Sequence, residues 1–221
     1  MPIPKVDWGG VQFAWGIPTV RDRVVQTALA YVLEPIFERD FAEHSYGFRP
    51  GRNAQQAIAR VETLLAQGQV WVVDADLKGY FDSIPQDKLL QAVAHKVADG
   101  RILRLLEAYL QQGVLESAKD WQPTPHGTPQ GAVISPLLAN LYLDPLDHRM
   151  AGQGRDMIRY ADDFIILCRS QAEAQAALAE VAAWVQEAGL VLHPSKTRIV
   201  NASQPGGFDF LGWHFERGWK W

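Results

Sequence analysis

The sequence contains the segment Met157-Ile158-Arg159-Tyr160-Ala161-Asp162-Asp163-Phe164-Ile165-Ile166-Leu167, in which two adjacent acids separate two short apolar runs. This pattern predicts a β-hairpin that carries both carboxylates at its tip. Two ionised neighbours repel each other, and an ordinary turn gains little from having both. A divalent metal ion would relieve the repulsion, so the hairpin predicts a metal site.

A second acidic strand end lies far upstream. The apolar run Val70-Trp71-Val72-Val73 leads directly into Asp74-Ala75-Asp76-Leu77. Because side chains alternate between the two faces of a strand, Asp74 and Asp76 are predicted to share one face. The two acidic strand ends can therefore converge on the same pair of metal ions.

Composition indicates a globular protein. The chain has 221 residues, 48% of them hydrophobic, and contains eight Trp, which is enough apolar material to bury a core. The sequence contains no run near the roughly 18 apolar residues of a membrane span and begins without a signal-peptide core, so we expect a cytoplasmic protein. Cys168 is the single cysteine and is predicted to be a core residue, which leaves no cysteine-based zinc site.

The overall charge does not by itself indicate a nucleic-acid partner. Lys and Arg number 21 against 25 Asp and Glu, for a formal net charge of −4. The first quarter of the chain is nevertheless basic, which favours local contact with a polyanion, although scattered solvated arginines would look the same. The basic residues are Arg21, Arg23, Arg49, Arg52 and Arg60.

The order of predicted elements indicates an α+β fold. Helical spacing of apolar residues runs from about residue 22 to residue 41, where Pro35 is expected to break the helix. Asn53 and Ser170 are each predicted to cap a later helix. Together with the two acidic strands, these helices predict an antiparallel sheet that helices cover on one face and that presents the acids on the open face.

Seven motifs in order resemble those of bacterial group II intron-encoded reverse transcriptases, and the similarity extends from about Trp15 to Trp213. The resemblance implies one reverse transcriptase domain, with partial fingers over residues 1–70, a palm of antiparallel strands backed by helices over residues 71–221, and a primer-grip hairpin at about residues 208–217. The motifs are Gly16–Arg23, Ser45–Arg52, Asp76–Asp82, Gly127–Gly131, Ser135–Asn140, Tyr160–Asp163 and Gly189 to Lys196.

The same resemblance implies an RNA-directed DNA polymerase. Such an enzyme adds deoxynucleoside triphosphates to the 3′-hydroxyl of a primer on an RNA template, using two magnesium ions. Asp76, Asp162 and Asp163 would be the catalytic acids and metal ligands, with the Leu77 carbonyl as a further ligand. Lys196 would protonate the leaving pyrophosphate, although a solvated Lys would fit the sequence equally well. The implied partners are the RNA template, a DNA primer or target DNA, the nucleotides and intron RNA.

Further roles follow from the resemblance for residues that contact substrate. Phe81 would lie against the sugar of the incoming nucleotide, where a bulky ring rejects a 2′-hydroxyl; its alternative is a buried aromatic. The hairpin near Trp213 would hold the primer, or would be only an amphipathic edge strand. The remaining implied contacts are Arg21 and Arg23 with the triphosphate, Gln130 and Gly131 with the templating pair, Arg49 and Arg52 with the template, and Gly212 and Trp213 with the primer.

The sequence also departs from the family pattern. No helical thumb follows the primer grip before Trp221, so we expect weak or poorly processive synthesis. This leaves two rivals open: a maturase-like remnant that binds RNA without turnover, and a palm enzyme that makes a cyclic nucleotide. The loop over residues 128–131 argues against the second rival. The sequence leaves the oligomeric state open.

Overall fold

The computed structural model describes residues 18–112, 114–117, 120–122, 126–128, 131–216 and 219–220. The chain forms two compact units, one from residues 1–39 and 81–142 and the other from residues 40–80 and 143–221. Each unit therefore joins an early and a late segment of the chain. The division into fingers before residue 70 and palm after it stays a prediction.

The first unit is mainly helical. Its first helix begins at a Thr19 capping box and continues to Glu38, so the predicted break at Pro35 is wrong. Pro35 falls in the last turn, where a missing N–H removes a single helical hydrogen bond, and the buried Phe37 holds that turn in place. The elements are α1 (Val20–Glu38), α4 (Gln86–Ala94), α5 (Gly100–Leu110), the antiparallel pair β2 (Val114–Ser117) and β3 (Asp120–Gln122), and the start of α6 (Ser135–Gly152). The short helix α3 (Tyr80–Ser83) leads into this unit.

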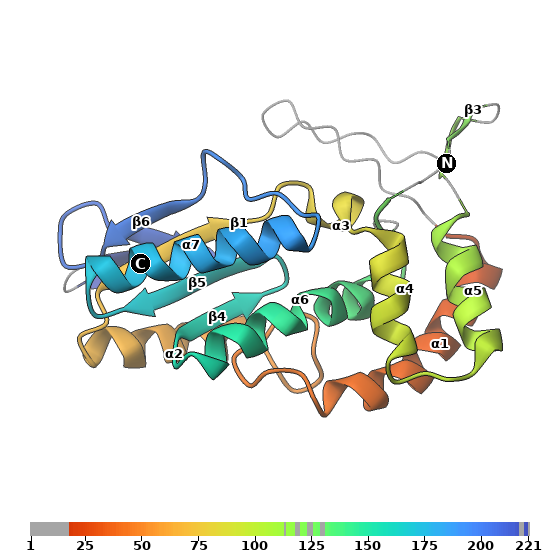
Figure 1. Cartoon of the computed structure of the whole chain (residues 1–221), viewed down its shortest axis with the longest axis horizontal. Helices are drawn as coiled ribbons and strands as arrows, with labels where there is room; N and C mark the ends of the chain where they lie inside the picture. Colours follow the sequence, from red (N-terminus) through yellow and green to blue (C-terminus); the bar gives the residue numbers. More distant parts are fainter. Residues whose placement is uncertain are drawn as a thin grey trace. The chain divides into compact units, whose positions relative to one another are not determined.

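The second unit is built on a four-stranded antiparallel sheet in the order β4-β5-β1-β6. Helix α7 contacts β1, β5 and β6 and lies across one face of the sheet (Figure 1). Its buried residues include Ala174 and Ala177, whose small side chains let the helix approach the strands closely. The elements are β1 (Trp71–Asp76), β4 (Asp156–Tyr160), β5 (Asp163–Cys168), β6 (Arg198–Asn201) and α7 (Gln171–Glu187).

The opposite face of this sheet is covered over part of its length. Helix α2 (Ala54–Ala66), which Asn53 caps as predicted, buries Ile58 and Val61 against Ile158 and Ile165. Three aromatic residues of the C-terminal hairpin, Phe208, Phe210 and Phe215, complete this cluster. The expected open face is therefore open only near the strand ends that carry the acids. The hairpin strands are β7 (Phe208–Phe210) and β8 (Trp213–Glu216), followed by β9 (Trp219–Lys220).

These findings confirm the α+β fold with an antiparallel sheet backed by helices. Cys168 is buried at the end of β5, and burial raises the pKa of its thiol to about 11, as expected for a core residue. Within the described ranges, no helix combines the length and apolar character needed to cross a membrane.

Candidate active site

Strand register brings the two acidic segments together. Asp76, at the end of β1, pairs directly with Asp163 at the start of β5. Asp74 pairs with Ile165 two residues away, so Asp74 and Asp76 share one face of the sheet, as the period-two pattern predicted, and the register places Asp163 on the same face. Carboxylates from segments almost ninety residues apart thus meet at one edge of the second unit.

Asp162 belongs to the tight turn that joins β4 to β5. Tyr160 pairs with Asp163, which leaves Ala161 and Asp162 as the two turn residues. Ala161 has a φ of 60°, in the left-handed region that favours glycine. Gly47 packs against this turn so closely that a Cβ at residue 47 would collide with the Ala161 backbone nitrogen. The predicted acidic hairpin is confirmed, and its turn is held in a specific, strained conformation.

The acids of this edge repel one another. Burial and, to a smaller extent, the charges of Asp74, Asp76 and Asp162 together raise the pKa of Asp163 to about 7, while the charge of Lys196 opposes this rise. Burial also raises the pKa of Asp162, with Asp76 adding to the effect. An excess of negative charge at a partly buried site is the electrostatic environment that a cation stabilises.

Two basic residues contact these acids. The Lys196 ammonium donates to Asp76 Oδ2 at 2.6 Å, although 62% of the Lys196 side chain is exposed. This hydrogen bond is the main reason why the pKa of Lys196 is raised. Arg198 Nε donates to Asp74 Oδ2 at 3.0 Å, a pairing the sequence did not reveal because residues 74 and 198 become neighbours only through the β1–β6 register.

The donor chemistry of this edge fits magnesium, which prefers carboxylate and carbonyl oxygens. Among the residues that the structure describes, no three His, Cys, Asp or Glu side chains are placed closely enough to bind one ion together. The backbone of Leu77 forms a bridge with Leu192 whose two hydrogen bonds use the Asp76 carbonyl and the Lys78 amide. Neither bond involves the Leu77 carbonyl, the predicted additional ligand.

The predicted nucleotide contacts belong to the first unit. Phe81 is half-buried on α3, and its carbonyl accepts a hydrogen bond from the Thr128 amide at 2.7 Å. Gly127 lies against the same carbonyl so tightly that a Cβ would collide with it. Gly131 is exposed with a φ of 88°, and Gln130 lies outside the described residues. Arg21 and Arg23 are exposed in the first turn of α1.

The predicted template contacts lie on the loop before α2. Arg49 is buried, and its Nη1 donates to the carbonyls of Ala42 at 2.6 Å and Ser45 at 2.7 Å. Arg49 therefore stabilises its own loop, and a contact with a template strand stays a prediction. The Arg52 guanidinium lies over the Tyr46 ring at 5.7 Å.

The predicted primer-grip hairpin is a hairpin in the structure. Phe210 pairs with Trp213, and the two residues between them, Leu211 and Gly212, both have positive φ. Positive φ at both central residues matches the twist of antiparallel strands, which makes this turn a tight hairpin connection. Trp213 is 38% exposed, so an aromatic surface is available beside the turn; residue 217, the predicted end, lies outside the described residues.

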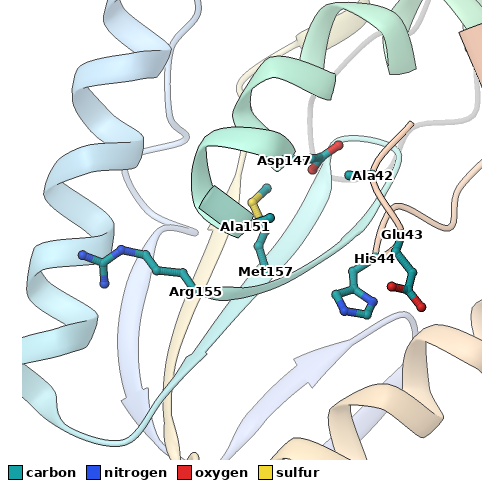
Figure 2. A pocket seen from close by; sticks show the side chains of 7 residues that line it. All are labelled: Ala42, Glu43, His44, Asp147, Ala151, Arg155 and Met157. Carbon is teal, nitrogen blue, oxygen red and sulfur yellow. The ribbon is translucent and has the colours of Figure 1, made fainter. Parts of the chain in front are cut away.

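A pocket of about 130 Å³ lies elsewhere in the second unit and is distinct from the acidic edge. Met157 lines this pocket. Ile158 packs against α2, and side chains alternate along a strand, so the Met157 side chain lies on the opposite face, which α7 covers. Figure 2 shows the Arg155 side chain directed away from the other lining residues, and Arg155 Nη1 donates to the Glu173 carbonyl of α7. The other lining residues are Ala42, Glu43, His44, Asp147 and Ala151.

This antiparallel sheet, with paired carboxylates at one edge and helices behind it, has the fold of the reverse transcriptase class. Residues 3–215 match the family model described as "Reverse transcriptase (RNA-dependent DNA polymerase)". The chain belongs to this family, as the sequence motifs predicted.

Curated relatives agree with this assignment. Protein YkfC of Escherichia coli is 33% identical over 89% of this chain and 61% of its own length. The group II intron-encoded protein LtrA of Lactococcus lactis is 40% identical over 60% of this chain and 22% of its own length. Nuclear intron maturase 2 of Arabidopsis thaliana is 27% identical over 87% of this chain and 31% of its own length. The chain thus spans between about a fifth and three fifths of these relatives.

Solved structures share the fold. Telomerase from Candida tropicalis, in complex with the TWJ fragment of telomeric RNA, superposes with a TM-score of 0.62 over 89% of this chain and 36% of its own, at 13% sequence identity. Apo telomerase from the same yeast also gives 0.62, over 90% of this chain and 38% of its own. At this identity the similarity shows the fold alone.

Proposed function

We propose that this chain is an RNA-directed DNA polymerase of the group II intron type, and that Asp76, Asp162 and Asp163 are its catalytic acids. The observation that carries the proposal is the β1–β5 register, which pairs Asp76 with Asp163 beside the Asp162 turn. The acids would hold two magnesium ions, which when bound activate the primer 3′-hydroxyl and stabilise the pyrophosphate. The raised pKa values of Asp162 and Asp163 support a site that takes up positive charge.

The residues around the acids would orient and protonate the reactants. The 3′-hydroxyl would release its proton to solvent, its oxygen would form a bond to the α-phosphorus of the nucleotide, and the bond from that phosphorus to pyrophosphate would break. Lys196 would donate a proton to the departing pyrophosphate, and its raised pKa supports the protonated form that this role requires. Phe81 would lie against the sugar, and Trp213 with Gly212 would contact the primer end.

The ion pair that Asp76 makes in this structure favours a second candidate function, RNA binding with little or no synthesis. Asp76 is paired with Lys196, whose ammonium group occupies a carboxylate that would otherwise be available to magnesium. The relatives include intron maturases. An RNA-binding protein with maturase-like activity and weak synthesis would have the same fold and motifs.

Primer extension separates the two functions. The test uses an oligo(dT)-primed poly(A) template, dTTP and magnesium, with the wild type, Asp162→Ala and the control Asp87→Ala, which changes an exposed acid on α4. A polymerase extends the primer with the wild type and the control and loses product with Asp162→Ala. If no protein extends the primer while all three bind labelled RNA in fluorescence anisotropy, the binding function replaces the polymerase.

A further inference from the structure

Arg159 is a buried arginine on the strand that leads into the acidic turn. Arg159 is only 1% exposed, and its side chain lies on the face of the sheet that α7 covers, opposite to Ile158 and Tyr160. Arg159 Nε donates to both carboxylate oxygens of Asp147, at 2.9 and 3.0 Å, and Nη2 donates to Oδ2 at 2.5 Å. Asp147 lies on α6 and is also buried. The two side chains form a buried ion pair next to the turn.

The same guanidinium contacts the turn itself. Arg159 Nη1 donates to the Ala161 carbonyl at 2.8 Å. Ala161 is the residue with the left-handed backbone, a conformation that is unfavourable for any residue other than glycine. A charged donor fixed by Asp147 therefore holds the carbonyl of the one strained residue that precedes Asp162 and Asp163.

The backbone of Arg159 is held by hydrogen bonds to the loop of residues 44–47. Its amide donates to the His44 carbonyl at 3.0 Å, and its carbonyl accepts from the Tyr46 amide at 2.8 Å. These two bonds place Gly47 against Ala161. The turn is thus contacted both by the Arg159 guanidinium and by the loop of residues 44–47.

A buried ion pair is a costly way to gain stability, because two charges must leave water. Burial opposes the charge of Arg159, yet the Asp147 carboxylate raises the pKa of Arg159 above its ordinary value, so the guanidinium stays charged. Apolar side chains of similar volume would fill the same space without this cost, but they could not hold the Ala161 carbonyl. The pair is therefore better explained by the geometry of the turn than by stability.

We propose that Arg159 and Asp147 are positioning residues for the catalytic acids: Asp147 orients Arg159, and Arg159 fixes the Ala161 carbonyl and with it the placement of Asp162 and Asp163 opposite Asp76. The consequence for magnesium rests on the polymerase function proposed above. The consequence for the turn conformation does not depend on that function.

The test compares Arg159→Lys, Arg159→Met and Asp147→Asn with the wild type. Asp147 borders the pocket shown in Figure 2, so its carboxylate can gain water when Arg159 is replaced, which favours a folded variant. The matched control is Arg60→Met, which breaks the 2.7 Å ion pair with Asp156 at the opposite end of the same strand.

The first measurement is hydrogen exchange at the amides of residues 160–163, which reports on the turn whether or not the protein is a polymerase. We expect exchange about tenfold faster in Arg159→Met and Asp147→Asn, a smaller change in Arg159→Lys because a lysine can still donate to the carbonyl, and no change in the control. Unchanged exchange in Arg159→Met, in a folded protein, overturns the proposal.

The second measurement is magnesium binding by titration calorimetry with MgCl₂. We expect affinity about 10- to 100-fold weaker in Arg159→Met, with partial rescue in Arg159→Lys, which is the usual effect of removing a residue that orients metal ligands. Equal loss of affinity in Arg60→Met would indicate general destabilisation and contradict positioning. If Asp162→Ala binds magnesium as tightly as the wild type, the proposed metal site fails, while the exchange result still decides the positioning role.

Discussion

Gly47 lies directly against the backbone of Ala161, although the two residues are far apart in the sequence. Residue 47 has no positive φ, so glycine is needed there for space and not for backbone conformation. The contact joins the loop before α2 to the turn that carries Asp162. This loop therefore belongs to the support of the acidic edge as well as being a candidate template contact.

We predict that Gly47→Ala lowers the free energy of unfolding by about 2 kcal/mol or more, because the new methyl group collides with backbone and not with a movable side chain. Primer extension should fall with it. Urea denaturation measures the change. The control is Gly152→Ala, where a Cβ meets no atom within 4 Å at the end of α6 and should be neutral or slightly stabilising. Equal stability of the two variants would contradict the packing argument.

The raised pKa of Asp163 predicts a stability that falls as the pH rises. Between about pH 4 and pH 7 the folded protein holds a proton on Asp163 that the unfolded chain has released, so rising pH favours the unfolded state. In EDTA at pH 8, Asp163→Asn should therefore be more stable than the wild type by about 2 kcal/mol. The full difference between the folded and unfolded pKa of Asp163 would correspond to roughly 4 kcal/mol. We expect a smaller effect because Asp163 is partly exposed and solvent screens its charge.

Chemical denaturation at pH 5 and pH 8 tests this expectation. The difference between the two proteins should grow with pH, and added magnesium should stabilise the wild type more than Asp163→Asn, because the ion replaces the missing proton. A difference that stays constant across the pH range would show that Asp163 has an ordinary pKa.

The ion pair between Lys196 and Asp76 predicts opposite effects on binding and on catalysis. Lys196→Met removes a cation that competes with magnesium for Asp76. Magnesium affinity should therefore rise about two- to fivefold, which is the factor in binding that corresponds to the free energy of an exposed ion pair. Primer extension should slow about 100-fold if Lys196 also protonates pyrophosphate. Calorimetry and single-turnover extension measure the two effects, and Lys88→Met, on the exposed side of α4, is the control. Weaker magnesium binding in Lys196→Met would refute the competition.

The tight turn of the C-terminal hairpin predicts a specific cost at residue 212. Gly212 has a φ of 80° with no atom near its absent Cβ, so Gly212→Ala should destabilise the protein through backbone strain alone, by about 1–2 kcal/mol. Trp213→Ala should cost less stability than truncation of the fully buried Phe210, because Trp213 is 38% exposed, and should weaken binding of a primer–template duplex. Thermal unfolding and fluorescence anisotropy separate the two results. A large loss of stability in Trp213→Ala would make Trp213 a structural residue.

Local sequence patterns were sufficient to predict the individual helices, strands and turns and the acidic residues that they carry. Alternation in Asp74-Ala75-Asp76 predicted the shared face, the Tyr160–Asp163 segment predicted the hairpin, and Asn53 and Ser170 predicted helix caps that the structure contains. Each of these depends on near neighbours in the chain, which is why periodicity and turn chemistry were sufficient. Pro35 was misjudged because its cost depends on its position within the final turn.

The residues that support the acids from distant parts of the chain could be identified only after the chain was folded. The pairing of Arg159 with Asp147, of Arg198 with Asp74 and of Lys196 with Asp76 depends on strand register and helix packing. An arginine inside an apolar strand was the one signal in the sequence for the first pair, since a buried charge requires a partner. The identity of a partner is a property of three-dimensional packing, and no local pattern in the chain encodes it.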